Sequence, residues 1–272
     1  MSLQGWLIDR LLLKRPRFRR WLTRLLEGDR DLEVQLMHTG ICVNTIREHG
    51  YVRASRMMPR SSFLNDESAV LLALAPLLGS ADAFVDAGAN VGVYTKILHR
   101  FSSMYSQLRY YAFEADPETA SRLRRTLADT SATVFPFALA EDEGSLEFVR
   151  GAVSHVSTRR DLATSYQTGE TFTVACRRLD ASDLVGKRIV LKSDVEGQEW
   201  NVLRGASGLF DANRILAVFL DGMAEPEPVA EYLRQQNFAL FDGRTLKPAE
   251  TSLPYALLAV HRDHLDRAPA GA

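Results

Sequence analysis

Two acidic residues at the ends of two short apolar segments are the first sign of chemistry in this sequence. One segment covers residues 83–86 and ends at Asp86, directly before a turn that holds Gly88 and Gly92. The other ends at Glu114, about 28 residues further along the chain. In a βαβ unit the second strand delivers an acidic residue at about this distance, where it binds the hydroxyls of a ribose. The spacing therefore predicts a nucleoside pocket.

The turn after Asp86 indicates which nucleoside. Its pattern is D-x-G-x-N-x-G, which matches neither of the glycine-rich spacings that bind dinucleotides or triphosphates. A carboxylate at the mouth of the turn would repel a pyrophosphate but suit a cation. S-adenosyl-L-methionine carries an ammonium and a sulfonium and no phosphate, so we predict it as the cofactor. We expect Gly88 and Gly92 to let the backbone approach that ligand closely. A glycine turn that binds no ligand is the alternative.

A third segment, residues 189–206 with the sequence IVLKSDVEGQEWNVLRGA, places charged residues at alternate positions. Alternation puts Lys192, Asp194 and Glu196 on one side of an extended segment. Two carboxylates that lie close together repel each other, which raises the pKa of one of them, while the charge of Lys192 lowers that pKa. We predict Asp194 as the base that takes a proton from the acceptor, with Glu196 and Lys192 shaping its charge. In the alternative interpretation, Asp194 caps the following helix or pairs only with Lys192.

The segments VDAGANVGVYT, FEADP and LKSDVEGQEWNVLRGA occur in this order, and with them the chain resembles the FkbM family of S-adenosylmethionine-dependent methyltransferases. The resemblance covers residues 65–222. It implies a class I methyltransferase fold and O-methylation of a hydroxyl, often on a sugar or a natural product. It also implies cofactor roles for the turn residues and Glu114, and strand-end roles for Asp194 and Glu196. Ser193 and Asp221 depart from the family, which usually has an apolar residue and often has Glu at those positions.

The candidate cofactor residues lie in the turn, in the helix start after it and at the ends of the next strands. They are Asp86, Gly88, Ala89, Asn90, Gly92, Tyr94, Thr95, Glu114, Ala115 and Ala138. Packing and capping are the alternative roles for Tyr94 and Thr95. The catalytic candidates are Asp194, Glu196, Lys192 and His155, and a solvated loop histidine is the alternative for His155. We predict no metal, although Asp194, Glu196 and Asp221 would suit magnesium as an oxygen-rich alternative.

Alternating strands and helices must position these residues. We predict strands at 83–87, 109–114, 132–137, 189–194, 214–221, 237–242 and 254–261, with helices at 92–100, 117–129, 198–210 and 226–236. This is an α/β fold of the class I methyltransferase (Rossmann-like) type, with a seven-stranded, mostly parallel sheet whose last strand is antiparallel. Strands at 145–149 and 171–176 flank the polar stretch 151–169, which we expect to be an acceptor-side loop.

We divide the chain into an N-terminal extension (1–60), the cofactor-binding methyltransferase domain (61–265) and a C-terminal tail (266–272). The extension combines basic amphipathic helical sequence with a β-hairpin predicted within residues 31–58, and a helix follows at 65–78. Residues 1–27 interleave arginines with Trp6, Phe18 and Trp21. We expect this helix to pack on the domain or on a second copy of the chain, with peripheral contact to an anionic membrane as the alternative.

The composition excludes several classes of protein. With 272 residues, 46% hydrophobic and a net charge of −1, the chain can bury a full core, and bulk charge does not favour a nucleic-acid partner. Cys42 and Cys176 are too few for a disulfide scaffold, so we predict free thiols and a cytoplasmic location. No stretch approaches the roughly 18 apolar residues that a bilayer requires.

We therefore predict an O-methyltransferase that acts on a small molecule or glycan. An N-methyltransferase of protein or nucleic acid is the alternative, but the fourth strand ends in LKSDVEG rather than N-P-P-Y or D-P-P-Y. A non-catalytic nucleoside-binding protein and a dehydrogenase are further alternatives. The retained acids disfavour the former, and the missing phosphate loop disfavours the latter.

Overall fold

The computed structural model describes residues 21, 24–25, 28–57, 62–104, 108–151, 158–159, 169–249 and 252–265. Most of the predicted basic helix, the loop that contains His155 and the tail at 266–272 lie outside these residues. The roles predicted for those segments therefore stay predictions.

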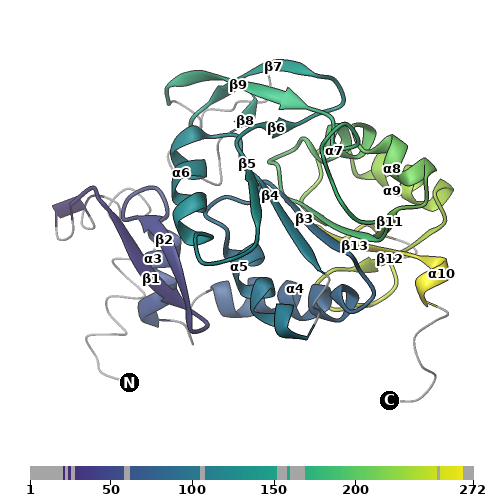
Figure 1. The fold of residues 1–272 in the computed structure, drawn as a ribbon, viewed down its shortest axis with the longest axis horizontal. Coiled ribbons are helices and arrows are strands. Elements are labelled where there is room, and N and C mark those ends of the chain that lie inside the picture. Colours follow the sequence, from purple (N-terminus) through teal and green to yellow (C-terminus); the bar gives the residue numbers. More distant parts are fainter. Residues whose placement is uncertain are drawn as a thin grey trace.

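A seven-stranded sheet forms the centre of the molecule (Figure 1). Its strands are β3 (Ala83–Ala87), β4 (Arg109–Phe113), β5 (Thr133–Phe135), β10 (Ile189–Ser193), β11 (Ile215–Asp221), β12 (Phe238–Asp242) and β13 (Ala256–His261). They lie in the order β12-β13-β11-β10-β3-β4-β5. Only β13 is antiparallel to its neighbours, which confirms the predicted sheet. Every residue of β3 and β10 is buried, as expected for central strands covered on both faces.

Helices cover both faces of this sheet. They are α4 (Ser62–Leu78), α5 (Val93–His99), α6 (Pro117–Thr126), α7 (Glu199–Arg204), α8 (Ser207–Asp211) and α9 (Pro226–Gln235), with a short 3-10 helix (Arg100–Ser103) after α5 and α10 (Arg262–Leu265) after β13. The helix predicted at 198–210 is wrong as a single element. A Cβ on Gly205 would lie 2.0 Å from the carbonyl oxygen of Ala140, so the chain turns there to pack against that backbone and forms α7 and α8. Helix α4 also begins three residues before the predicted Asn65.

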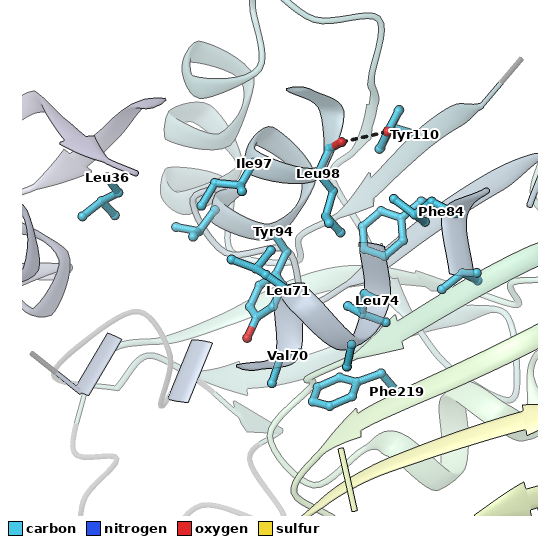
Figure 2. Close-up of a cluster of buried hydrophobic side chains, with 14 of the residues drawn as sticks. Leu36, Val70, Leu71, Leu74, Phe84, Tyr94, Ile97, Leu98, Tyr110 and Phe219 are labelled. Carbon is cyan, nitrogen blue, oxygen red and sulfur yellow. Dashed lines mark hydrogen bonds between the residues drawn. The ribbon is translucent and has the colours of Figure 1, made fainter. Parts of the chain in front are cut away.

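One large cluster of apolar side chains fills the face beneath α4 and α5. Figure 2 shows Leu74 of α4 and Ile97 of α5 in this cluster with Phe84 and Phe219 of the sheet. The Tyr110 hydroxyl is buried with them and donates a hydrogen bond to the carbonyl of Leu98, at 3.0 Å. A second cluster packs α7, α8 and α9 on the opposite face. The two clusters hold the strand ends in fixed positions.

The N-terminal extension packs on the same domain face. Strands β1 (Asp31–Leu36) and β2 (Thr39–Asn44) form the predicted hairpin, and Leu36 belongs to the cluster of Figure 2. The hairpin ends earlier than the predicted range of 31–58, because the later part of that range forms helix α3 (His49–Met57). The Asn44 side chain accepts hydrogen bonds from the backbone N–H groups of Ile46 and Arg47, which ends the strand.

A second, four-stranded sheet interrupts the strand-helix alternation between β5 and β10. Its strands are β6 (Ala138–Leu139), β7 (Gly144–Val149), β8 (Thr158–Arg159) and β9 (Thr171–Arg177), in the order β6-β9-β7-β8. The two strands predicted here are confirmed as β7 and β9. In Figure 1 this sheet lies beyond the ends of β4 and β5. Arg150 fastens it to the start of α6, since its guanidinium donates to Asp116 and Glu118.

Two smaller expectations can be checked in the described residues. Cys42 and Cys176 are both buried, and neither forms a disulfide within the described residues. No helix within the described parts of the chain has the length and apolar character needed to cross a bilayer.

Candidate cofactor pocket and catalytic carboxylates

A pocket of about 520 Å³, partly open to solvent, lies between the two sheets. Its walls come from the ends of β4 and β5, from the second sheet and from the turns after β3 and β10. The lining residues are Gly88, Phe113, Glu114, Ala115, Phe137, Ala138, Leu139, Leu146, Phe148, Val195 and Gln198. Four of them, Gly88, Glu114, Ala115 and Ala138, were predicted from the sequence. The lining is mostly apolar, and Glu114 is the only carboxylate among these described residues.

Glu114 supplies that carboxylate, and two backbone groups hold it in place. One oxygen accepts a hydrogen bond from the N–H of Asn90 and the other from the N–H of Asp116, both at 2.9 Å. Burial raises the pKa of Glu114 to about 7, although these two N–H groups oppose the shift. Each oxygen keeps a lone pair for a further donor. A ribose, with two adjacent hydroxyls, matches this arrangement.

The turn after β3 takes its shape from three left-handed residues. Gly88 has a φ of 73°, Asn90 of 51° and Gly92 of 86°. A Cβ on Gly88 would lie 2.0 Å from the carbonyl oxygen of Asp194, and one on Gly92 would lie 2.6 Å from a methyl of Leu123. Close packing within the protein therefore requires glycine at both positions, which the sequence did not reveal. The two glycines let the turn pack against β10 and α6.

Asp86 lies below this turn and not at its mouth, where we expected it. Its carboxylate is only 1% exposed. One oxygen accepts a hydrogen bond from Thr95 at 2.8 Å, and the other lies 3.1 Å from the ammonium of Lys192. The charge of Asp86 is therefore compensated inside the protein, and Thr95 serves this aspartate.

Lys192 connects Asp86 to the rest of the site. Its ammonium is also 3.8 Å from Asp194 and lies over the ring of Tyr94, 4.7 Å from the ring centre. Burial by itself would lower the pKa of Lys192, but the charges of Asp86 and Asp194 outweigh it and raise the pKa. The Tyr94 hydroxyl donates to Glu67 of α4. Tyr94 and Thr95 therefore support the site from beneath.

Of the two aspartates beside Lys192, Asp194 is the one that reaches solvent, with 34% of its side chain exposed. Loss of water around it raises its pKa to about 7, while the charge of Lys192 opposes the shift. It does not cap α7, whose N-cap residue is Gln198. The predicted pairing with Lys192 is present, yet it leaves the carboxylate accessible. A carboxyl with such a pKa can accept a proton near neutral pH.

Glu196 and Glu199 belong to the loop that holds Asp194. Glu199 is buried, and one of its oxygens accepts hydrogen bonds from the N–H groups of Val195 and Gly197, at 3.1 and 3.2 Å. This fixes a loop in which Glu196 has a φ of 53°. Loss of water and the charge of Asp194 raise the pKa of Glu196, although its side chain reaches the surface. Glu199 is a positioning residue whose role the sequence did not reveal.

The remaining candidates have separate positions. Asp221 ends β11 and lies 3.7 Å from the guanidinium of Arg244. Among the residues with described side chains, no three His, Cys, Asp or Glu groups are arranged to hold a metal ion. His155 lies outside the described residues.

Sequence reasoning missed the apolar walls of the pocket. Leu146 and Phe148 point to the same side of β7, and their alternation in a predicted strand was the available sign. Nothing in the sequence connected Glu67, which lies in α4, with Tyr94. Their contact depends on how α4 packs against α5.

The sheet order, the glycine turn and the acid at the end of the second strand define a class I, S-adenosylmethionine-dependent methyltransferase. Comparison with known families makes this specific. The Methyltransferase FkbM domain matches residues 86–240, more than half of the chain. The protein belongs to the FkbM methyltransferase family, which confirms the resemblance drawn from its motifs.

Individual relatives are more distant. The hexuronic acid methyltransferase AglP of Haloferax volcanii is 26% identical over 156 residues, which cover 57% of this chain and 62% of AglP. This chain thus matches less than two thirds of that relative. The crystal structure of a methyltransferase FkbM from Methylobacillus flagellatus aligns with 14% identity and a TM-score of 0.44, over 66% of this chain and 44% of that one. A TehB-like methyltransferase from Corynebacterium glutamicum aligns with 14% identity and a TM-score of 0.41, over 78% and 97% of the two chains.

Proposed function

We propose that this methyltransferase transfers a methyl group from S-adenosylmethionine to a hydroxyl of a sugar or glycan, with Asp194 as the base. The observation that carries the proposal is the solvent-accessible Asp194 carboxyl, whose pKa is raised to about 7, near a mostly apolar pocket that contains the Glu114 carboxylate.

The pocket fits the nucleoside half of the cofactor. Phe137, Leu146 and Phe148 offer apolar surface to a flat base, and Glu114 can accept hydrogen bonds from both ribose hydroxyls. The pocket lining contains no lysine or arginine, so it suits a ligand without phosphate. Asp86 would support the cofactor through the turn that it underlies, because Lys192 and Thr95 already engage its carboxylate.

The chemistry asks little of the protein beyond alignment and one proton transfer. S-adenosylmethionine, when bound, would supply a methyl group on a cationic sulfur, and that sulfur would keep the electrons of the broken sulfur–carbon bond. A hydroxyl is a weak nucleophile, and its proton must go to a base within hydrogen-bond reach. Asp194 can take that proton in its ionised form. Lys192 is held nearby as a permanent cation and keeps the carboxylate available at neutral pH.

A relative supports the acceptor class. AglP is named as a hexuronic acid methyltransferase, and the FkbM domain match over residues 86–240 of this chain includes Glu114 and Asp194. A sugar hydroxyl also suits an edge lined by carboxylates, since these accept hydrogen bonds from hydroxyls.

A labelled-methyl transfer screen tests the proposal. The panel holds methyl hexosides, methyl hexuronides and nucleotide sugars, and the methylated atom is located by NMR. We expect an O-methylated sugar, and we expect Asp194→Asn to lower kcat by about 10²–10⁴-fold with unchanged affinity for S-adenosylhomocysteine. Asp211→Asn, an exposed acid on α8, is the matched control. Unchanged turnover in Asp194→Asn would reject Asp194 as the base, and label on a nitrogen would reject O-methylation.

A further inference from the structure

The connection between β12 and β13 brings more side chains to the edge where the parallel strands end. Strand β12 finishes at this edge and β13 starts from it, because Asp221 pairs with Ala256 and Asp242 pairs with Leu257. Tyr255 precedes β13 directly, and Arg244 follows β12. Both residues therefore lie beside the end of β11, one strand away from Asp194.

Tyr255 presents an exposed aromatic ring at this edge. Its side chain is 71% exposed, although its backbone carbonyl is fixed by a hydrogen bond from the N–H of Gly222, at 2.9 Å. The hydroxyl oxygen would lie 3.1 Å from a Cβ on Gly222. Partial burial of the hydroxyl and the charges of Asp221, Glu196 and Asp194 raise its pKa. The hydroxyl end thus faces the acids, and the ring remains accessible.

Arg244 completes a polar rim around that ring. Its guanidinium carbon lies 5.9 Å from the centre of the Tyr255 ring, and one of its nitrogens lies 3.7 Å from a carboxylate oxygen of Asp221. A cationic donor, an anionic acceptor and an aromatic face therefore meet at one place. A pyranose has matching features, since one face is apolar C–H surface and its rim carries hydroxyls.

We propose that Tyr255, Arg244 and Asp221 form the binding site for the pyranose ring of the acceptor, an inference that rests on the proposed function. The sugar lies on the Tyr255 ring, Arg244 donates to a sugar oxygen and Asp221 accepts from a sugar hydroxyl. A neighbouring hydroxyl then reaches Asp194.

The order of the strands supports this division of the site. The nucleoside pocket is built on β3, β4 and β5, and the Tyr255 site is built on β11, β12 and β13. Asp194 follows β10, which lies between the two groups. Cofactor and acceptor would thus lie on opposite sides of β10, so that the acceptor oxygen could meet the methyl group opposite the sulfur, as an in-line displacement requires.

The test measures sugar binding without turnover. Protein saturated with S-adenosylhomocysteine is mixed with methyl β-D-glucopyranoside or methyl β-D-glucopyranosiduronate, and binding is followed by saturation-transfer NMR. We expect at least one sugar to bind, Tyr255→Ala to weaken that binding at least tenfold, and Tyr255→Phe to keep it within about twofold because the ring remains. Arg244→Gln should weaken binding as well. Leu72→Ala, which removes an exposed side chain from α4, is the control.

Calorimetry with S-adenosylhomocysteine separates failure of this site from failure of the proposed function. If that ligand binds but neither sugar does, or if Tyr255→Ala leaves sugar binding unchanged, the acceptor site is rejected and the proposed function stands. Equal losses in Tyr255→Ala and Tyr255→Phe would also reject the platform role. If the wild-type protein does not bind S-adenosylhomocysteine, both proposals are overturned.

Discussion

Asp86 and Asp194 belong to neighbouring strands at the same edge of the sheet and share one lysine, yet their surroundings differ. The Lys192 ammonium lies 3.1 Å from the first carboxylate and 3.8 Å from the second. Asp86 is 1% exposed and has a further hydrogen bond from Thr95. Asp194 is 34% exposed, and its pKa is raised to about 7.

The difference shows that residue type and spacing do not assign a role by themselves. A buried carboxylate that is held by a cation and by a hydrogen-bond donor makes its contacts inside the protein, so it organises structure. A carboxylate that reaches solvent with few donors can gain and lose a proton, so it can do chemistry. In this protein Asp86 lies buried beneath the turn, and Asp194 reaches solvent, which fits its proposed role as the base.

We expect the largest effect from removing the charge of Lys192, because the buried carboxylate of Asp86 depends on it. In Lys192→Met the charge of Asp86 stays buried without its partner, and such a loss typically costs about 3–5 kcal/mol of folding free energy. We expect a marked fall in stability, measured by urea denaturation. The double variant Lys192→Met/Asp86→Asn should recover part of the loss, because position 86 no longer carries a buried charge.

Lys187→Met is the control for that experiment, since Lys187 is exposed and lies before the other end of β10. We expect its stability to match the wild type. If Lys192→Met were equally stable, Asp86 would not depend on the ion pair, and the contrast between the two aspartates would lose its basis.

The cofactor side can be weakened without disturbing the acids. Phe148→Ala removes an aromatic wall of the pocket, and loss of such a contact corresponds to about 1–2 kcal/mol, or roughly tenfold in affinity. We expect that change in the dissociation constant of S-adenosylhomocysteine, with kcat at saturating cofactor almost unchanged. Ser145→Ala is the control because Ser145 lies on the opposite side of β7. If Phe148→Ala binds S-adenosylhomocysteine as tightly as the wild type, the adenine of the cofactor does not lie against this wall.

The sequence predicted the parts of this site that depend on local pattern. The strand ends at Asp86, Glu114 and Asp194 follow from apolar runs and from the geometry of parallel strands. The start of α6 at Pro117 was also predicted, and the structure shows that the Asp116 carboxylate caps it by accepting from the N–H groups of Glu118 and Thr119.

The rest depends on contacts between distant segments. The burial of Asp86 arises from strand pairing, which sets it directly opposite Lys192. The apolar wall at Phe148 exists because a second sheet folds back over the end of β4. Tyr255 became a candidate only when the antiparallel pairing of β13 placed it beside Asp221. No local pattern encodes these distances.

The pH dependence of turnover and of cofactor binding should separate the role of Asp194 from that of Glu114. We expect this effect to be smaller than those of the substitutions above. Asp194 must be ionised to accept a proton, so kcat at saturating substrates should fall as the pH drops through about 7. For one group with that pKa the loss is about fourfold at pH 6.5. Burial raises the pKa of Glu114 to about 7 as well. In the proposed site Glu114 would bind ribose as a carboxylate, so S-adenosylhomocysteine affinity should fall over the same range. Glu114→Gln should remove the pH dependence of binding and keep that of kcat. If this variant removes both, a single carboxyl controls the whole site, and the separate roles of the two sides are refuted.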